Sequence, residues 1–347
     1  MFCFGLDKVI INNISIKTIM DIDKLEKMHL KGKIIFIKSV LDIREIECLK
    51  IVDDRFGILT AGVKISNNTM IRWSILDLNK PSSNNENNMI PMRMEEFRND
   101  YLRGIFDYIE KVYGIIFYEE EKSFKEVEVN YTFALEEKYE LYEKVFFEMM
   151  KNAPKTYKYR EVKTDHRTNK SSFYLKNNSI EVKIYDKTYE LKTKQNFDSK
   201  IKTLCRIEYR LKEGGNSSRK IKEIFSSRKI DDISDEQLKK FFCNQFSKDF
   251  IIPMNKFIEN QKKETKKALK EKRKIERSYI TKCMLELLSE DRIFDLEIFC
   301  ECIKEIDKKN AKRNQANVLR NVELKKQEGN IRRYKEILNK VDLVKGI

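Results

Sequence analysis

The sequence lacks several features on which common enzyme classes depend. None of its ten glycines falls in a GxGxxG or GxxxxGK[ST] pattern, so nucleotide hydrolysis on a phosphate-binding loop is not expected. The two histidines, His29 and His166, form neither an HExxH motif nor a His-hydrophobic-His pair. Seven scattered cysteines include no CxxC pair, which favours reduced thiols over a disulfide framework or a zinc site. No stretch approaches the roughly 18 apolar residues of a membrane span, and the start carries no charged leader. We therefore expect a cytoplasmic protein that makes no membrane contact.

The sequence also has fewer acidic than basic residues. The 347 residues are enough for two or three domains, and Lys and Arg outnumber Asp and Glu by 71 to 56, which gives a net charge of +15. Such an excess predicts an anionic partner, and nucleic acid is the leading class. An AT-rich genome would also enrich lysine, but that bias does not explain why the charge is clustered.

The chain divides into a strand-rich part and a helical part. Residues 8–80 contain β-branched runs separated by turn residues, residues 93–113 and 136–152 have helical periodicity, and Gly114 is a plausible C-terminal stop. Further strands are predicted at residues 125–133, 172–175, 180–187 and 204–212. A polar linker begins at Gly214, and almost everything after it is helical. We predict an α+β fold, with an antiparallel-sheet domain in residues 1–215 and a basic, mainly helical region in residues 216–347 that binds DNA or a partner.

The positive charge is concentrated in two C-terminal segments. Residues 262–277 and residues 307–333 each contain nine Lys or Arg and three acidic residues, a net charge of +6 in each segment. A solvated helix face with Lys and Glu pairs would explain part of this pattern. The imbalance of sign favours contact with DNA phosphates, and the candidate residues are Lys262, Lys266, Lys270 and Arg273.

Two neighbouring strands carry the most informative pattern. In residues 180–187, Lys183, Tyr185 and Lys187 point away from the apolar side. In residues 204–212, Arg206, Glu208 and Arg210 do the same. If the strands pair, a hydroxyl, several cations and a carboxylate meet on one face of a sheet. This inventory suits phosphodiester chemistry.

Each of these residues also has an ordinary structural explanation. A strand tyrosine such as Tyr185 is more often a packing residue, and Glu208 is more often a cross-strand partner of Arg or Lys. Glu126 and Glu128 share one face of the strand at 125–133, where like charges are unfavourable unless a cation lies between them. The case for a site therefore depends on all three strands together.

The segment from Asn99 to Lys212 resembles the replication initiators of small plasmids and phages that use rolling-circle replication. The most specific elements are Ile184-Tyr185-Asp186-Lys187 with Glu190 three residues later, and Arg206-Ile207-Glu208-Tyr209-Arg210-Leu211-Lys212. These elements are similar to those of the trans-acting plasmid Rep family and of phage gene II/X-type replication proteins. The resemblance covers about a third of the chain.

The resemblance implies a site-specific DNA-nicking enzyme. Tyr185 would attack an origin phosphodiester to form a 5′-phosphotyrosine, and Lys187 would steady the phosphate. Glu128 and Glu208, with Glu126, would hold Mg²⁺ or Mn²⁺, since hard ions prefer oxygen ligands. Further candidates near the site are His166, Asp186, Glu190 and Tyr189, and the candidate phosphate contacts are Lys183, Arg206 and Arg210.

The resemblance implies that the partner is DNA of the replication origin, in double- and single-stranded form. A host helicase is a further candidate partner, and whether the protein forms a homodimer is left open. Two alternatives to a replication initiator remain at this point. One is a related relaxase of conjugative mobilisation. The other is a non-catalytic, sequence-specific DNA-binding protein for copy control or partition, which would use the same basic helices and keep the sheet only as a scaffold.

Overall fold

The computed structural model describes residues 2–346, except for residues 15, 21, 33, 39–45, 67–68, 80–90, 119–121, 166–169, 196–202, 213–216, 276, 290–291, 293 and 321–328. The chain forms two compact units, and each is discontinuous in sequence. The first contains residues 1–134 and 176–242, and the second contains residues 135–175 and 243–347. The fold class is α+β, as predicted. The assignment of separate functions to residues 1–215 and 216–347 remains a prediction.

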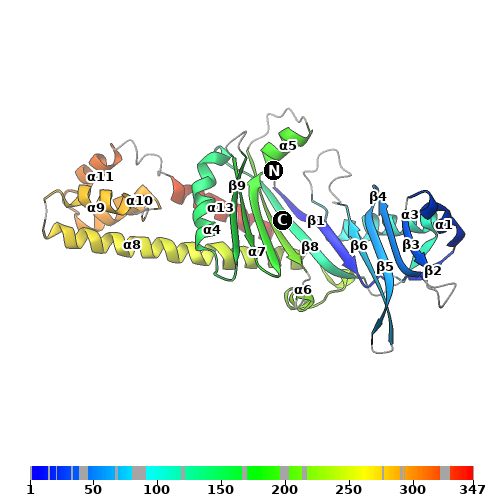
Figure 1. The fold of residues 1–347 in the computed structure, drawn as a ribbon. Coiled ribbons are helices and arrows are strands. Elements are labelled where there is room, and N and C mark those ends of the chain that lie inside the picture. Colours follow the sequence, from blue (N-terminus) through cyan, green and yellow to red (C-terminus); the bar gives the residue numbers. More distant parts are fainter. Residues whose placement is uncertain are drawn as a thin grey trace. The chain divides into compact units, whose positions relative to one another are not determined.

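The first unit is organised around an antiparallel sheet. Its strands lie in the order β3-β4-β5-β6-β1-β8-β12-β11, as Figure 1 shows for its central members. The strands are β1 (Phe2–Asn12), β3 (Ile34–Lys38), β4 (Ile46–Asp53), β5 (Gly57–Ser66), β6 (Thr69–Leu78), β8 (Ser123–Ala134), β11 (Ile180–Asp186) and β12 (Leu204–Lys212). A separate pair consists of β2 (Ile16–Ile19) and β7 (Ile115–Phe117). The helices are α1 (Ile22–Leu30), α2 (Met94–Glu96), α3 (Arg103–Tyr113), α5 (Lys187–Gln195) and α6 (Ser217–Phe225).

Alternation along β8 and β12 explains why these strands lie at the centre of the sheet. Val127, Val129, Tyr131 and Phe133 are buried on one face of β8, and Cys205, Ile207, Tyr209 and Leu211 are buried on the same face of β12. The first part of α7 (Asp235–Phe246) covers this face, where the ring of Phe242 packs edge-on against Phe4, Tyr131 and Tyr209. The apolar side is therefore closed by a helix, and the polar side carries the remaining chemistry.

The second unit is mainly helical. Its elements are α4 (Glu143–Asn152), β9 (Tyr159–Asp165), β10 (Lys170–Lys176), α8 (Ile252–Arg273), α9 (Tyr279–Ser289), α10 (Leu296–Ile306), α11 (Ala311–Leu319) and α13 (Asn330–Asp342). Buried polar contacts hold the unit together. Tyr142 donates a hydrogen bond to Glu336, and Tyr157 donates one of 2.6 Å to Asp249.

Most of the predicted elements are present, with shifted ends. The predicted helix at 93–113 is a continuous helix in which residues Phe97–Leu102 form a π-helical segment, and Gly114 adopts the left-handed conformation after its end. The strand predicted to extend to Lys187 ends at Asp186 instead. Lys187 begins α5, so Tyr189 lies on a helix and not on the strand that carries Tyr185. Among the turn residues that separate the runs in 8–80, Asn67 and Asn68 lie outside the described residues.

Candidate metal centre and tyrosine

Four adjacent strands place their polar side chains on one face of the sheet. In the pairing of β11 with β12, Tyr185 lies opposite Arg206 and Lys183 lies opposite Glu208. In the pairing of β12 with β8, Glu208 lies opposite Asn130 and Arg210 lies opposite Glu128. Because side chains alternate between the two faces of a strand, this register brings the predicted polar sets of β8, β11 and β12 together.

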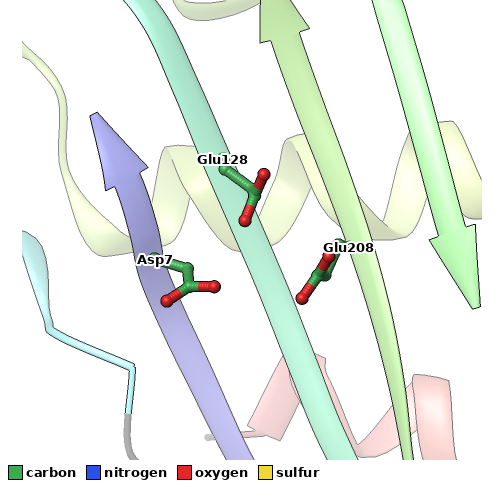
Figure 2. Close-up of side chains that lie close together, drawn as sticks. All are labelled: Asp7, Glu128 and Glu208. Carbon is green, nitrogen blue, oxygen red and sulfur yellow. The ribbon is translucent and has the colours of Figure 1, made fainter. Parts of the chain in front are cut away.

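Three buried carboxylates converge on this face. Asp7 on β1, Glu128 on β8 and Glu208 on β12 each offer an oxygen atom, and these atoms lie within 4.8 Å of one another. Figure 2 shows the three side chains pointing toward a shared point from neighbouring strands. Asp7 is fully buried, while Glu128 is 7% and Glu208 6% exposed. We refer to these three residues as the acidic triad.

A local irregularity in β1 accompanies Asp7. The register between β1 and β8 shifts between Leu6 and Val9, which is the mark of a β-bulge, and Asp7 lies within it. Just before the bulge, the backbone of Met92 crosses β1 and exchanges two hydrogen bonds with Leu6, of 2.8 and 3.0 Å. Gly5 permits this approach, since a Cβ atom there would lie 2.5 Å from the Met92 carbonyl oxygen.

Each member of the acidic triad has a cation about 4 Å away. Arg206 Nη1 is 3.9 Å from Asp7, Arg210 Nε is 3.8 Å from Glu128, and Lys183 Nζ is 4.0 Å from Glu208. Arg206 is itself buried, and its Nε donates a hydrogen bond of 2.7 Å to the Thr132 hydroxyl. These cations offset the charge of the carboxylates, which would otherwise be costly to bury together.

Tyr185 contacts the acidic triad directly. Its hydroxyl donates a hydrogen bond of 2.7 Å to Glu208 Oε1. Lys183 Nζ lies 3.9 Å from the centre of the Tyr185 ring. Tyr185 itself is only 5% exposed. Burial, with the nearby charge of Glu208 as a second cause, raises the pKa of the Tyr185 hydroxyl well above its usual value. The ring is thus buried but lies on the polar face, and its hydroxyl meets a carboxylate.

The residues that follow Tyr185 form the start of α5. Asp186 Oδ1 accepts a hydrogen bond of 3.0 Å from the Tyr189 backbone N–H, which caps the helix. Lys187 is buried and lies 2.7 Å from Glu190. Burial, followed by the charge of Arg206, lowers the pKa of Lys187. Tyr189 lies half-buried on α5. The charge of Asp7 also acts on the pKa of Lys187, so this lysine lies near the acidic triad.

Other predicted site residues are placed differently. Glu126 is outside the acidic triad and pairs with Arg210. On α8, Lys262 lies 3.2 Å from Glu301 and Lys266 lies 2.6 Å from Glu305, so both are engaged with α10. Arg273 donates a hydrogen bond to the Ile306 carbonyl, and Lys270 is exposed. His166 lies outside the described residues.

The acidic triad fits a divalent metal ion. Carboxylate oxygens are the ligands that Mg²⁺ and Mn²⁺ prefer, and oxygens on opposite sides of such an ion are separated by about 4 to 5 Å. Asn130 lies between the triad strands, paired in register with both Gly5 and Glu208. Its side chain is fully buried, and within the described part of the chain neither its amide oxygen nor its amide nitrogen has a hydrogen-bond partner. A buried amide of this kind suits a site that holds a ligand or its water.

Asp7 was missed in the sequence prediction, although a signal for it exists. Phe2, Phe4 and Leu6 alternate with Cys3, Gly5 and Asp7. That alternation predicts a strand with Asp7 on its polar face. The prediction began the first strand at Val9 instead. The pattern within one strand does not reveal which strands pair, so it could not show that Asp7 lies next to Glu128 and Glu208.

Over the described residues, no helix combines the length and the apolar character that a membrane span requires.

The chain has a distant likeness to a solved structure. No protein-family model matches the chain, and a search of curated proteins gave no match. Among solved structures, the chain is similar to one described as the structure of a rolling circle replication initiator protein from Geobacillus stearothermophilus. That match has 10% identity and a TM-score of 0.34, and it covers 72% of this chain and 86% of the other. A likeness this distant assigns neither fold nor function to this chain.

Proposed function

We propose that this protein initiates rolling-circle replication by nicking DNA at an origin, with Tyr185 as the nucleophile and a divalent metal ion held by the acidic triad. The observation that carries the proposal is the hydrogen bond from the Tyr185 hydroxyl to Glu208, which is also one of the three converging carboxylates. A buried hydroxyl next to a metal-type carboxylate cluster is an arrangement for phosphoryl transfer.

The sequence motifs support the same conclusion. Tyr185 and Glu208 belong to the two elements that resemble the trans-acting Rep family, and Glu128 lies on the third strand. We assign the nicking chemistry to residues 1–215 and the duplex-binding role to residues 216–347. The partner proposed for both is origin DNA.

The metal ion would be held by Asp7, Glu128 and Glu208, with Mg²⁺ or Mn²⁺ as the candidates. When bound, it would polarise the scissile phosphate and stabilise the charge that develops on its oxygens. Glu126, the third metal ligand expected from sequence, is replaced in this proposal by Asp7.

The reaction is a displacement at phosphorus. Tyr185 Oη attacks the phosphorus atom and gives its proton to Glu208 Oε1, which lies 2.7 Å away. The bond from phosphorus to the 3′ oxygen breaks, and that oxygen takes up a proton from solvent to become a free 3′-hydroxyl. The other product is a tyrosine phosphodiester at the 5′ end. Because this bond conserves the energy of the phosphodiester, the same site can later rejoin strands.

The cations around the acidic triad bind and orient the phosphate. Lys183 lies over the Tyr185 ring and is 29% exposed in its side chain, so it can turn toward an incoming phosphate and uncover the hydroxyl. Arg210 is partly exposed beside Glu128, and Lys187 lies at the start of α5. Positive groups near the equatorial oxygens stabilise the transition state more than the ground state.

The test is a nicking assay with the full-length protein. A supercoiled plasmid carrying the gene for this protein and its flanking DNA is incubated with Mn²⁺, and the products are examined for open circles and for a protein–DNA adduct that survives denaturant. We expect Tyr185→Phe to abolish both while duplex binding is retained. Tyr189→Phe is the matched control, since it removes a hydroxyl from α5 and should leave the adduct intact.

Two outcomes would contradict the proposal. If Tyr185→Phe still forms the adduct, the nucleophile is another residue and Tyr185 only positions Glu208. If the wild-type protein binds the plasmid tightly but never nicks it with Mn²⁺ or Mg²⁺, the non-catalytic DNA-binding alternative is correct.

A further inference from the structure

Four helices at the C-terminal side of the second unit share a small core of their own. Figure 1 shows α9, α10 and α11 gathered at one end of α8. The core is apolar and includes Leu269, Cys283, Leu287, Phe299, Ile303 and Val318. We refer to α9, α10, α11 and the end of α8 as the helix cluster. The apolar sides of these helices are buried against one another, so their polar outer sides face solvent and can contact a partner.

Helices α10 and α11 form a helix–turn–helix arrangement. Only residues 307–310 separate the end of α10 at Ile306 from the start of α11 at Ala311. Asp307 anchors this turn by accepting hydrogen bonds from Tyr279 (3.1 Å) and Asn314 (3.3 Å). Gln315 Nε2 donates a hydrogen bond of 2.9 Å to the Cys300 carbonyl oxygen. These bonds fix the inner face of α11 against α10.

The outward face of α11 is basic and contains no acid. Ala311 and Val318 are buried and Asn314 and Gln315 are half-buried, which marks the inner side at helical spacing. Exposed residues on the turn and the outer side are Lys308, Lys309, Lys312, Arg313, Ala316, Asn317, Leu319 and Arg320. In the described part of the chain, none of these five cations has a carboxylate partner. We refer to this set as the α11 face.

The basic residues of α8 contrast with the α11 face. Lys262 and Lys266 are both paired with carboxylates of α10. Their charge is largely offset within the protein, so they stabilise the packing of α8 against α10. The α11 face keeps its charge available for an external anion.

A polar hollow lies beside α11. Its volume is about 570 Å³, and its rim includes Arg277, Ser278 and Thr281 near the start of α9 together with Arg313 and Asn317 of α11. The amino-terminal end of α9 carries a partial positive charge from the helix dipole and has backbone N–H groups to offer. Two arginines, two hydroxyls and a helix start line this hollow, but the carboxylate of Asp307 lines it too, so the hollow carries charge of both signs.

We infer that the α11 face is the recognition helix of a helix–turn–helix module and that it enters the major groove of duplex DNA. Arg313 and Asn317 lie one turn apart on α11 and are the side-chain types that pair bidentately with guanine and adenine edges. Lys308, Lys309 and Lys312 contact flanking phosphates. The inference goes beyond the proposed nicking function and would hold without it, since groove binding needs no chemistry.

The composition of the α11 face favours duplex DNA over a membrane surface. Leu319 is its only large apolar side chain and is 38% exposed. Helices that lie on membranes bury a broad apolar face, which α11 does not offer.

The first test measures binding of the full-length protein to a 30-base-pair random-sequence duplex at several salt concentrations. We expect Lys309→Gln with Lys312→Gln to weaken binding by about tenfold and to reduce the salt slope by about 2, since each phosphate contact contributes about 0.9. The matched control is Lys256→Gln with Lys335→Gln, which removes two exposed lysines from α8 and α13 and should leave the slope unchanged.

The second test measures specificity by selecting bound duplexes from a random pool. Arg313→Ala and Asn317→Ala should each relax the selected sequence at one or two positions and cost on the order of 10- to 100-fold in affinity for the wild-type sequence. The inference is overturned if the lysine variant keeps the wild-type slope or the control pair loses as much. It is also overturned if anionic vesicles or single strands bind the α11 face as tightly as duplex does.

The two proposals fail separately. Arg313→Ala with Asn317→Ala should lose duplex recognition yet still cleave a single-stranded oligonucleotide that spans the nick site. Tyr185→Phe should show the reverse pattern.

Discussion

Replacing Asp7 by asparagine should make the metal-free protein more stable. The triad oxygens lie within 4.8 Å of one another. Two unit charges at that distance repel by about 3.5 kcal/mol at an effective permittivity of about 20. Asp7→Asn removes two such repulsions, about 7 kcal/mol, and gives up the attraction to Arg206 at 3.9 Å, about 4 kcal/mol. Lys187 also loses its attraction to Asp7, so the expected gain in the free energy of unfolding is at most about 2 to 3 kcal/mol when no divalent ion is bound.

The same substitution should remove most of the response to metal. For the wild-type protein, Mn²⁺ at about 100 times its Kd adds about 2.7 kcal/mol to the free energy of unfolding. If the loss of one carboxylate weakens binding about 100-fold, the variant gains only about 0.4 kcal/mol at the same concentration. In EDTA the Asp7→Asn variant should therefore be more stable than the wild type, and in Mn²⁺ the two proteins should have nearly the same free energy of unfolding.

Urea unfolding in EDTA and in Mn²⁺ measures both effects. Trp73 lies on β6, so its fluorescence reports on the unit that holds the acidic triad. Asp53→Asn is the control, because Asp53 accepts hydrogen bonds from Tyr108 and Tyr113 away from the triad and its loss should destabilise the protein equally in both buffers. A destabilised Asp7→Asn variant in EDTA, or one with the full metal response, would refute the reasoning.

Two further predictions concern stability. Gly5→Ala should lower the free energy of unfolding in urea by about 1 to 3 kcal/mol, because the new Cβ would lie 2.5 Å from the backbone oxygen of Met92. Gly104→Ala on α3 is the control: its Cβ meets nothing within 4 Å, so the change should be neutral or stabilising. Equal effects of the two substitutions would contradict the close approach of Met92 to Gly5. Asp295 is buried at the start of α10, and burial raises the pKa of its carboxyl to about 6. Its protonated form is therefore favoured by the folded state, and relative to Asp295→Asn the wild type should lose about 2.4 kcal/mol of stability as the pH rises from 4 to 7. Urea unfolding across that range checks the sign, and a difference that does not change with pH would count against it.

The strands of the candidate site could be predicted because their alternation is strong. The apolar residues from Val127 to Phe133 on β8 and from Cys205 to Leu211 on β12 share one face in register, so the polar residues of β8, β11 and β12 lie on the opposite face, as predicted. Pairing two such strands requires only that they be antiparallel neighbours. This is why Glu128, Glu208 and Tyr185 could be grouped from sequence.

The remaining parts depended on contacts that sequence periodicity does not report. Asp7 was missed because its place in the site follows from the pairing of β1 with β8, which are far apart in sequence. Lys187 was assigned to a strand because the alternation continues through it, but capping by Asp186 starts a helix there. Counting charge along residues 262–277 did not reveal that Lys262 and Lys266 face carboxylates of α10. The net charge of a segment can be counted from sequence, but whether a lysine is paired with a carboxylate depends on which helix packs beside it.

The assembly of the acidic triad from three distant segments has a consequence for the cell. The carboxylates come from β1, β8 and β12, and β8 must lie between the other two strands before all three can share an ion. A nascent chain on the ribosome, or a proteolytic fragment that has lost any one of these strands, therefore has no complete set of ligands. If the acidic triad holds the metal ion as proposed, a metal-dependent activity is expected only once synthesis has passed residue 208.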